Sequence, residues 1–214
     1  MRGWIVRGLK TRRIKMNQNK TAFIFAGVNG AGKSTLYWNE VEKGVRLGQR
    51  INMDEIVSSF GDWRSSKDQN RAARIALKLQ KSHIENNESF NQETTLCGKG
   101  IVRLFEQLKE QDFKICLYYV GVDSIEIAKE RVKMRVAKGG HNIDETLIER
   151  RYTASLNNLK QILPFCDEVF LYDNSHKLKK IGEIICGRVC LFEQAKWLDS
   201  IHSEKDNKDK NFKQ

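Results

Sequence analysis

A short apolar run leads directly into a glycine-rich loop, and this junction constrains the fold more than any other feature of the chain. Residues 21–27 read TAFIFAG, the continuous apolar pattern of a strand buried in a parallel sheet. Gly27 then opens GVNGAGKS, which satisfies G-x-x-x-x-G-K-[ST], and a helical pattern begins at Ser34. A strand, a glycine-rich turn and a helix in this order predict a loop that binds phosphate.

The residue types of this loop suit a nucleotide. Glycines let the backbone turn its N–H groups inward around a phosphate, and a helix N-terminus adds about half a positive charge. Lys33 is expected to reach the β- and γ-phosphates of ATP, and the Ser34 hydroxyl to contact Mg²⁺. Ser34 is therefore the predicted metal ligand. The predicted nucleotide-binding set is Asn29, Gly30, Ala31, Gly32, Lys33, Ser34 and Thr35.

Strand and helix patterns alternate along the rest of the chain. Further strands are expected at 50–52, 89–93, 113–120 and 168–172, and helices at 34–43, 64–86, 100–111, 124–138 and 144–162. The alternation predicts a three-layer α/β fold around a central, mainly parallel, five-stranded sheet. At the C-terminal end, 181–185 and 189–192 predict an edge hairpin around Cys186, Gly187 and Arg188, and 193–201 a final helix.

Length and charge bound the domain organisation. The 214 residues fit one domain, and no run approaches the roughly 18 apolar residues of a membrane span, so we expect a cytoplasmic protein without a membrane partner. The net charge is +11, and six of these charges lie in residues 1–15. We expect a disordered basic head at 1–18, one domain at 19–202 and a disordered tail at 203–214. The rest of the chain, with a net charge of about +5, suits an anionic substrate. Only the basic residues 1–15 would attract nucleic acid, through nonspecific contacts with its phosphates.

The cysteines predict neither disulfides nor a metal site. Their number is odd and no pair has C-x-x-C spacing, which is typical of reduced thiols in a reducing compartment. We expect all five to pack in the interior: Cys97, Cys116, Cys166, Cys186 and Cys190.

One carboxylate is well placed for catalysis. Asp54 follows the short second strand. Because the carboxyl ends of parallel strands meet at one edge of a sheet, Asp54 is expected to face the γ-phosphate. There it would act as general base on a substrate hydroxyl. The alternative is an N-cap for a helix beginning at Glu55, and position alone does not separate the two. The run ILPFCDE at 162–168 is interrupted by Pro164 and predicts no central strand.

The remaining candidates lie at the end of the third strand and on a helix pair joined by Gly139 and Gly140. This pair is expected to form a lid whose arginines stabilise the charge of a transferring phosphoryl group, although a solvated basic face is the common alternative. His141 follows the double glycine, and a single histidine in a loop is more often solvated than catalytic. The candidates are Glu93, Thr94 and Thr95 for a polar substrate pocket or a strand-end cap, Arg135 and one of Arg150 and Arg151 for the clamp, and His141 for substrate contact.

Taken together, these stretches resemble the zeta-toxin family of P-loop kinases, in particular its short bacterial members described as predicted ABC-type ATPases. The matching segments appear in the expected order between about residues 20 and 190: FAGVNGAGKST at 25–35, INMDEI at 51–56, FNQETTL at 90–96, ERVKMRVAKGGHNID at 130–144 and ERRYTASLNNLKQILPFCDEVFLYDNS at 149–175.

The resemblance implies a P-loop kinase fold with a small helical lid and an ATP- and Mg²⁺-dependent phosphotransferase. It further implies transfer of the γ-phosphoryl group to a hydroxyl of a nucleotide sugar such as UDP-N-acetylglucosamine, and a toxin held by a separate antitoxin. Lys33 and Ser34 would hold phosphate and metal, Asp54 would be the base, Glu93 and Thr94 would contact substrate, and Arg135 would stabilise charge. The Gly-Gly-His-Asn lid element and the short chain depart from the long toxins, so a kinase for another metabolite and a regulatory ATPase without an acceptor remain open.

Overall fold

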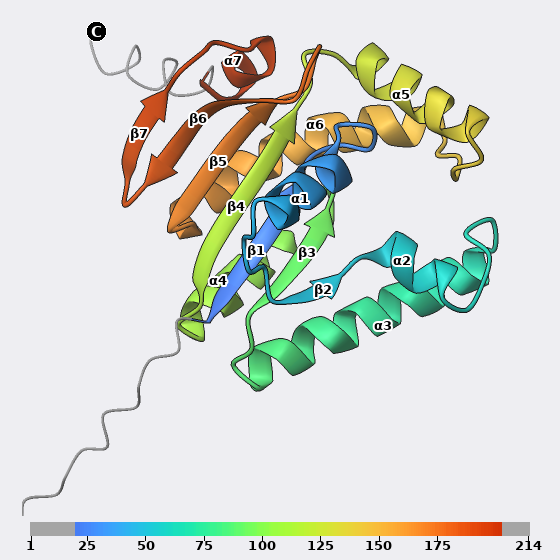
Figure 1. The fold of residues 1–214 in the computed structure, drawn as a ribbon, viewed down its shortest axis with the longest axis horizontal. Helices are drawn as coiled ribbons and strands as arrows, with labels where there is room; N and C mark the ends of the chain where they lie inside the picture. Colours follow the sequence, from blue (N-terminus) through green and yellow to red (C-terminus); the bar gives the residue numbers. More distant parts are fainter. Residues whose placement is uncertain (1–19, 203–214) are drawn as a thin grey trace, which may run out of the picture.

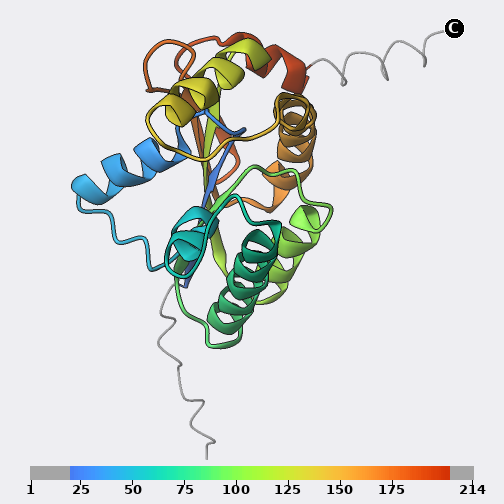
Figure 2. The same cartoon turned by 90° about the vertical axis from the view of Figure 1, so that its right-hand side faces the viewer.

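The computed structural model describes residues 20–202, and it consists of one twisted sheet with helices on both faces (Figures 1 and 2). The predicted head at 1–18 and tail at 203–214 lie outside the described residues. The strand order is β2-β3-β1-β4-β5-β6-β7. The bounds are β1 (Thr21–Ala26), β2 (Gln49–Ile51), β3 (Phe90–Thr94), β4 (Lys114–Gly121), β5 (Glu168–Asp173), β6 (Lys179–Ile185) and β7 (Arg188–Leu191).

The first five strands are parallel, and β6 and β7 continue the sheet antiparallel as a hairpin. The expected α/β class, parallel core and edge hairpin are therefore confirmed, and the hairpin brings the sheet to seven strands. The helices are α1 (Lys33–Glu42), α2 (Met53–Ser58), α3 (Ser66–Glu85), α4 (Ile101–Glu110), α5 (Ile125–Ala137), α6 (Glu145–Ile162) and α7 (Lys196–His202).

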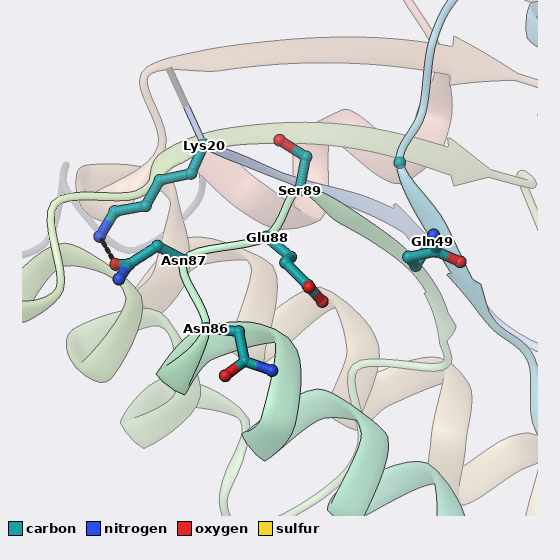
Figure 3. Close-up of a pocket in the computed structure, with 7 residues that line it drawn as sticks. Lys20, Gln49, Asn86, Asn87, Glu88 and Ser89 are labelled. Carbon is teal, nitrogen blue, oxygen red and sulfur yellow. Dashed lines mark hydrogen bonds between the residues drawn. The ribbon is translucent and has the colours of Figure 1, made fainter. Parts of the chain in front are cut away.

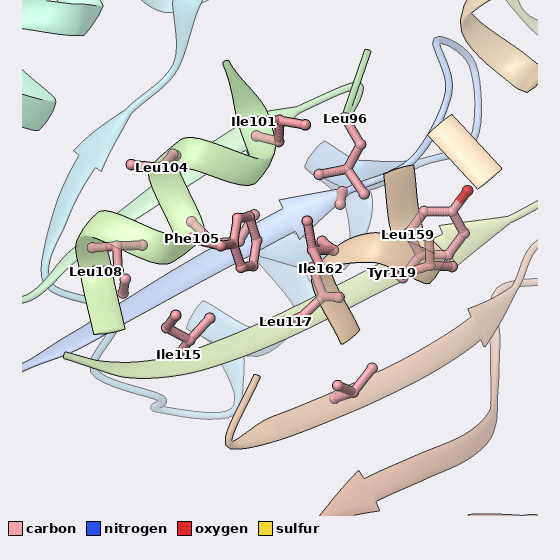
Figure 4. Packing of buried hydrophobic residues seen from close by; sticks show 14 of the residues in the cluster. Leu96, Ile101, Leu104, Phe105, Leu108, Ile115, Leu117, Tyr119, Leu159 and Ile162 are labelled. Carbon is pink, nitrogen blue, oxygen red and sulfur yellow. The ribbon is translucent and has the colours of Figure 1, made fainter. Parts of the chain in front are cut away.

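Strand β4 shows why the sheet is buried on both faces. Successive side chains of a strand point to opposite faces, so Ile115, Leu117 and Tyr119 pack under α4 and α6 while the residues between them pack on the α1 and α5 side. Figure 4 shows the first of these layers, in which Phe105 and Leu108 of α4 are fully buried against the sheet. Figure 2 shows α1 on one side of the sheet and α3, α4 and α6 on the other.

Two local expectations are settled by the structure. Pro164 lies in a 3₁₀ turn at Leu163–Phe165, so no strand forms there, as predicted. The N-cap of α2 is Asn52, whose side-chain oxygen accepts hydrogen bonds from the backbone N–H of Asp54 at 2.8 Å and of Glu55 at 3.2 Å. The alternative role of Asp54 as a helix cap is therefore wrong, because the helix begins earlier, at Met53.

The cysteine expectation is correct only in part. All five cysteines are free thiols, Cys116 is buried, and Cys97 and Cys166 are partly buried. Cys186 and Cys190 are exposed, because they lie on the outermost hairpin, which none of the helices within residues 20–202 covers. None of the helices within residues 20–202 has both the length and the apolar character needed to cross a bilayer.

Candidate functional site

The glycine-rich loop connects the carboxyl end of β1 to the amino end of α1, and its backbone requires glycine. Gly27, Gly30 and Gly32 have φ angles of +142°, +79° and +103°. A Cβ on Gly27 would lie 2.3 Å from the Val120 carbonyl oxygen, and one on Gly30 would lie 2.6 Å from the Ala128 carbonyl oxygen. The loop is thus pressed between β4 and α5 in a single conformation at a helix N-terminus.

Lys33 lies at the centre of the charged groups of the site. Its Nζ donates a hydrogen bond to the Val28 carbonyl oxygen at 3.2 Å, folding the side chain back over the loop. Burial lowers the pKa of Lys33, while the carboxylates of Glu93 and Asp54 act to raise it and the Arg135 charge to lower it. An ammonium folded back over the glycine-rich loop is well suited to receive a polyanion.

Glu93 lies beside the loop and is fixed from behind by Arg50. The Ser34 hydroxyl donates to Glu93 Oε2 at 2.9 Å, and the Arg50 guanidinium donates to Glu93 Oε1 at 2.6 Å. Arg50 also donates to Glu55 Oε1 at 2.8 Å and stacks over the Tyr37 ring, with Cζ 3.5 Å from the ring centroid. Burial opposes the charged form of Arg50, but the hydrogen bonds to Glu93 and Glu55 leave its pKa raised.

The lid meets Asp54 through His141. Asp54 lies in the first turn of α2 with a side chain 65% exposed, and its Oδ2 is 3.7 Å from His141 Nδ1. Arg135, near the end of α5, donates to the His141 carbonyl oxygen at 3.0 Å. Burial lowers the pKa of His141, Arg135 and Arg151 lower it further, and Asp54 opposes them. His141 is therefore not the solvated loop residue that its position favoured, since it bridges α2 and α5.

The two arginines of α6 differ in position. Arg151 donates to the Asn29 side-chain oxygen at 2.8 Å, which connects the lid to the glycine-rich loop, and burial lowers the pKa of Arg151. Arg150 is exposed. The structure thus brings Arg151, rather than Arg150, to the loop.

The threonines after β3 serve local contacts. Thr94 Oγ1 accepts a hydrogen bond from the Leu96 backbone N–H at 3.1 Å, and the Thr95 carbonyl oxygen accepts one from the Cys97 thiol at 3.0 Å. Both residues shape the turn beside Glu93, which is the strand-end alternative considered for them.

Two contributors were missed by sequence reasoning. Arg50 was read only as part of a short strand, although a charged residue in such a pattern is itself a sign of a buried partner. Asn174, after β5, donates from its side chain to the Ala31 carbonyl oxygen at 2.8 Å and so supports the loop from across the sheet edge.

The residues beside the loop fit a magnesium ion bound with nucleotide. Mg²⁺ at such sites keeps waters and phosphate oxygens and takes only one or two protein oxygens. The Ser34 hydroxyl and the Glu93 carboxylate, already 2.9 Å apart, are oxygen ligands of this type. Among residues 20–202 no group of three or more His, Cys, Asp and Glu side chains is arranged to hold a metal by itself.

Two surface hollows lie within residues 20–202, one beside the lid and one at the opposite end of the sheet. One of about 420 Å³ lies beside the lid and is lined by Arg131, Met134, Arg135, Lys138 and Gly140. The other, of about 360 Å³, is polar and lies at the amino ends of β1, β2 and β3 (Figure 3), with Lys20 bonded to Asn87 across it. Because the loop is at the carboxyl ends of the strands, the second hollow is not part of the candidate site.

Comparison with known proteins identifies a relative and a fold. No family model matches the chain. An uncharacterised protein of Haemophilus influenzae is 33% identical over 141 residues, which cover 66% of this chain and 98% of the relative.

Among solved structures, a chain of the AvrRxo1-ORF1:AvrRxo1-ORF2 complex with sulphate ions has a TM-score of 0.68 at 15% identity, covering 87% of this chain and 65% of that one. The complex with ATP gives 0.67 at 16%, covering 87% and 64%. A chain of the PezAT toxin–antitoxin system of Streptococcus pneumoniae gives 0.54 at 15%, covering 78% and 74%. These likenesses show a P-loop kinase-like fold, and this chain spans slightly under two thirds of the AvrRxo1 chains.

Proposed function

The chain belongs to the same family as the Haemophilus influenzae protein, and we propose that it is an ATP-dependent small-molecule kinase of the zeta-toxin type. The observation that carries the proposal is the meeting of three elements at the glycine-rich loop. Glu93 accepts a hydrogen bond from Ser34 of the loop at 2.9 Å, and Arg151 of the lid donates to Asn29 of the loop at 2.8 Å. Asp54 of α2 lies 3.7 Å from His141 of the lid. A nucleotide-binding loop, a carboxylate and a cation on the lid together suit phosphoryl transfer better than nucleotide binding alone.

In this proposal ATP binds through the amides of residues 29–35 and through Lys33, with Ser34 as the protein ligand of Mg²⁺. The ion would neutralise charge developing on the β- and γ-phosphates. Asp54 accepts the proton of the acceptor hydroxyl, for which its 65% exposed side chain is accessible. Arg135 stabilises the charge of the transferring group.

The acceptor side is formed by the groups around Asp54 and the lid. We propose that Glu93, Thr94, Thr95, His141, Arg150 and Arg151 contact the substrate. The favoured substrate is a nucleotide sugar such as UDP-N-acetylglucosamine, whose diphosphate suits the cations Arg135 and Arg151. A kinase for another metabolite would share all of these residues except those that read the acceptor.

The comparisons support an ATP-dependent role and a protein partner without establishing either for this chain. One similar complex was solved with ATP, and another belongs to a toxin–antitoxin system. We propose accordingly that the protein acts in the cytoplasm as the toxin of such a pair, held by a separate antitoxin chain.

The test is a transfer assay with purified protein, ATP, Mg²⁺ and a panel of hydroxyl compounds that begins with UDP-N-acetylglucosamine. Mass spectrometry should find one added phosphate on one member of the panel, and Lys33→Ala should abolish the gain. ATP hydrolysis at a rate indifferent to every added compound would instead support a regulatory ATPase.

A further inference from the structure

The outer edge of the sheet, β7, carries apolar side chains that nothing in the described part of the chain covers. All four residues of β7 are exposed. Two of them are large and apolar, Val189 at 68% and Leu191 at 41% exposed, and they are flanked by Phe192 at 55% and by Ile185 of β6 at 37%. In Figure 1 this strand is the last of the sheet, on the side away from β2. An accessible edge strand of this composition is a template for pairing with another strand.

The hydrogen bonding of the hairpin fixes which backbone groups face the open edge. Cys186 and Gly187 form the two-residue turn, so Ile185 and Arg188 are its closing pair, and the Phe192 N–H donates to the Ile181 carbonyl oxygen at 2.8 Å. Residues of an antiparallel strand bond alternately to one neighbour and the other. Arg188, Cys190 and Phe192 therefore bond toward β6, while Val189 and Leu191 direct their N–H and C=O groups outward.

This edge is complementary to itself. If a second β7 lies antiparallel with the two-fold axis at Cys190, Val189 of one copy comes opposite Leu191 of the other, and each such pair exchanges both backbone bonds. Cys190 then faces Cys190 of the second copy in a non-hydrogen-bonded position, where Cα atoms lie about 4.5 Å apart. No shift of register is needed to satisfy the outward groups.

The side chains match in the same register. On one face, the row Val169, Ile184, Val189 runs from the core to the edge, since Val169 is fully buried and Val189 is largely exposed. In the paired arrangement, Leu191 of the second copy continues this row. On the opposite face Arg188 comes opposite Phe192 of the second copy, which is a cation–π pair.

We propose that β7 is a dimerisation surface, at which a second copy of this chain adds its own β7 antiparallel about Cys190 and joins the two sheets. A contact centred on a four-residue strand belongs to the weak, transient class of interface. The proposal does not depend on the kinase assignment, since β7 is a lateral edge of the sheet and the glycine-rich loop lies at the carboxyl end of β1.

Two segments outside the described residues are the other occupants to consider. Residues 203–214 contain Phe212 as their one large apolar side chain and so lack the pattern to continue an apolar row. Residues 1–19 include Trp4, Ile5 and Val6, and a chain lacking these residues is therefore part of the test.

The first experiment tests the register by oxidation in a glutathione disulfide buffer. Each protein disulfide formed from two thiols passes two electrons and two protons to glutathione disulfide, giving two reduced glutathione molecules. Cys186→Ser, which keeps Cys190, should form a covalent dimer, and Cys190→Ser, which keeps Cys186, should not. In the proposed register the two Cys186 residues are eight positions apart along the paired strands, or about 27 Å. Equal cross-linking of the two variants, or none with either, overturns the proposal.

The second experiment measures association by sedimentation velocity over a range of protein concentrations. Val189→Pro removes an N–H that points outward and leaves the bonds to β6 intact, so dimerisation should weaken at least about tenfold at an unchanged melting temperature. Leu191→Lys is a second variant with an intact backbone and the same expected result. A wild-type chain that is monomeric at every concentration, or a dimer that survives both substitutions, overturns the proposal. Dimerisation that appears only after residues 1–19 are removed overturns it as well, by assigning the edge to that segment.

Discussion

Arg50→Met provides the sharpest structural test of the site, because it removes the cation that fixes Glu93. The side chains of Arg50 and Glu93 are 14% and 10% exposed, and their closest atoms are 2.6 Å apart. Loss of one partner from a buried pair costs about 3–5 kcal/mol, since the other charge stays buried without its counterion. Glu93 retains the hydrogen bond from Ser34, so we expect the free energy of unfolding to fall by about 2–4 kcal/mol.

The assay is urea unfolding followed by circular dichroism, with Glu55→Gln as the matched control. Glu55 binds the same guanidinium at 2.8 Å but is 51% exposed, and exposed pairs contribute only about 0–1 kcal/mol. In the double variant Arg50→Met with Glu93→Gln, neither member of this pair is left as a charge without its partner, so the combined loss should be smaller than the sum of the single losses. An Arg50→Met cost no larger than that of Glu55→Gln, or strict additivity in the cycle, would refute the reasoning.

Three further outcomes are expected. Gly30→Ala should weaken ATP binding at least about tenfold in isothermal titration calorimetry, because its Cβ would lie 2.6 Å from the Ala128 carbonyl oxygen; unchanged affinity would contradict this. Burial lowers the pKa of His141 below 6.5, so the unfolded chain binds more protons at this residue than the folded chain does. The free energy of unfolding should therefore decrease as the pH falls below 6.5, and His141→Gln should remove this part of the pH dependence. An identical pH profile in the variant would contradict the burial of His141. Leu108→Ala, at a fully buried position, should cost about 2–5 kcal/mol in the same unfolding assay, whereas a loss under about 1 kcal/mol would contradict the packing of α4 against the sheet.

The parts of the fold that follow from local patterns could be predicted. The strands β1 and β4 are continuous apolar runs because both of their faces are covered, and the glycine-rich loop is defined by spacing alone. The hairpin was recognisable from the run Cys186-Gly187-Arg188 between two apolar stretches. The structure shortens the connection to a two-residue turn, with φ angles of +49° at Cys186 and +75° at Gly187, because Arg188 already pairs with Ile185.

The parts that depend on register could not be predicted. Arg50 meets Glu93 only because β2 pairs with β3 so that Arg50 lies beside Asn91, two residues before Glu93. The side chain of Asn174 reaches the loop from 143 positions further along the chain. Likewise, the exposure of Cys190 follows from the place of β7 at the sheet edge, which no local pattern contains.

The most direct test of the central claim is a comparison of ATP binding and phosphoryl transfer in Asp54→Asn. The substitution keeps the size of the side chain and removes the carboxylate that would accept the proton of the acceptor hydroxyl. We expect ATP affinity close to that of the wild type and a rate of transfer about 10²–10⁴-fold lower. Transfer at the full wild-type rate would contradict the account.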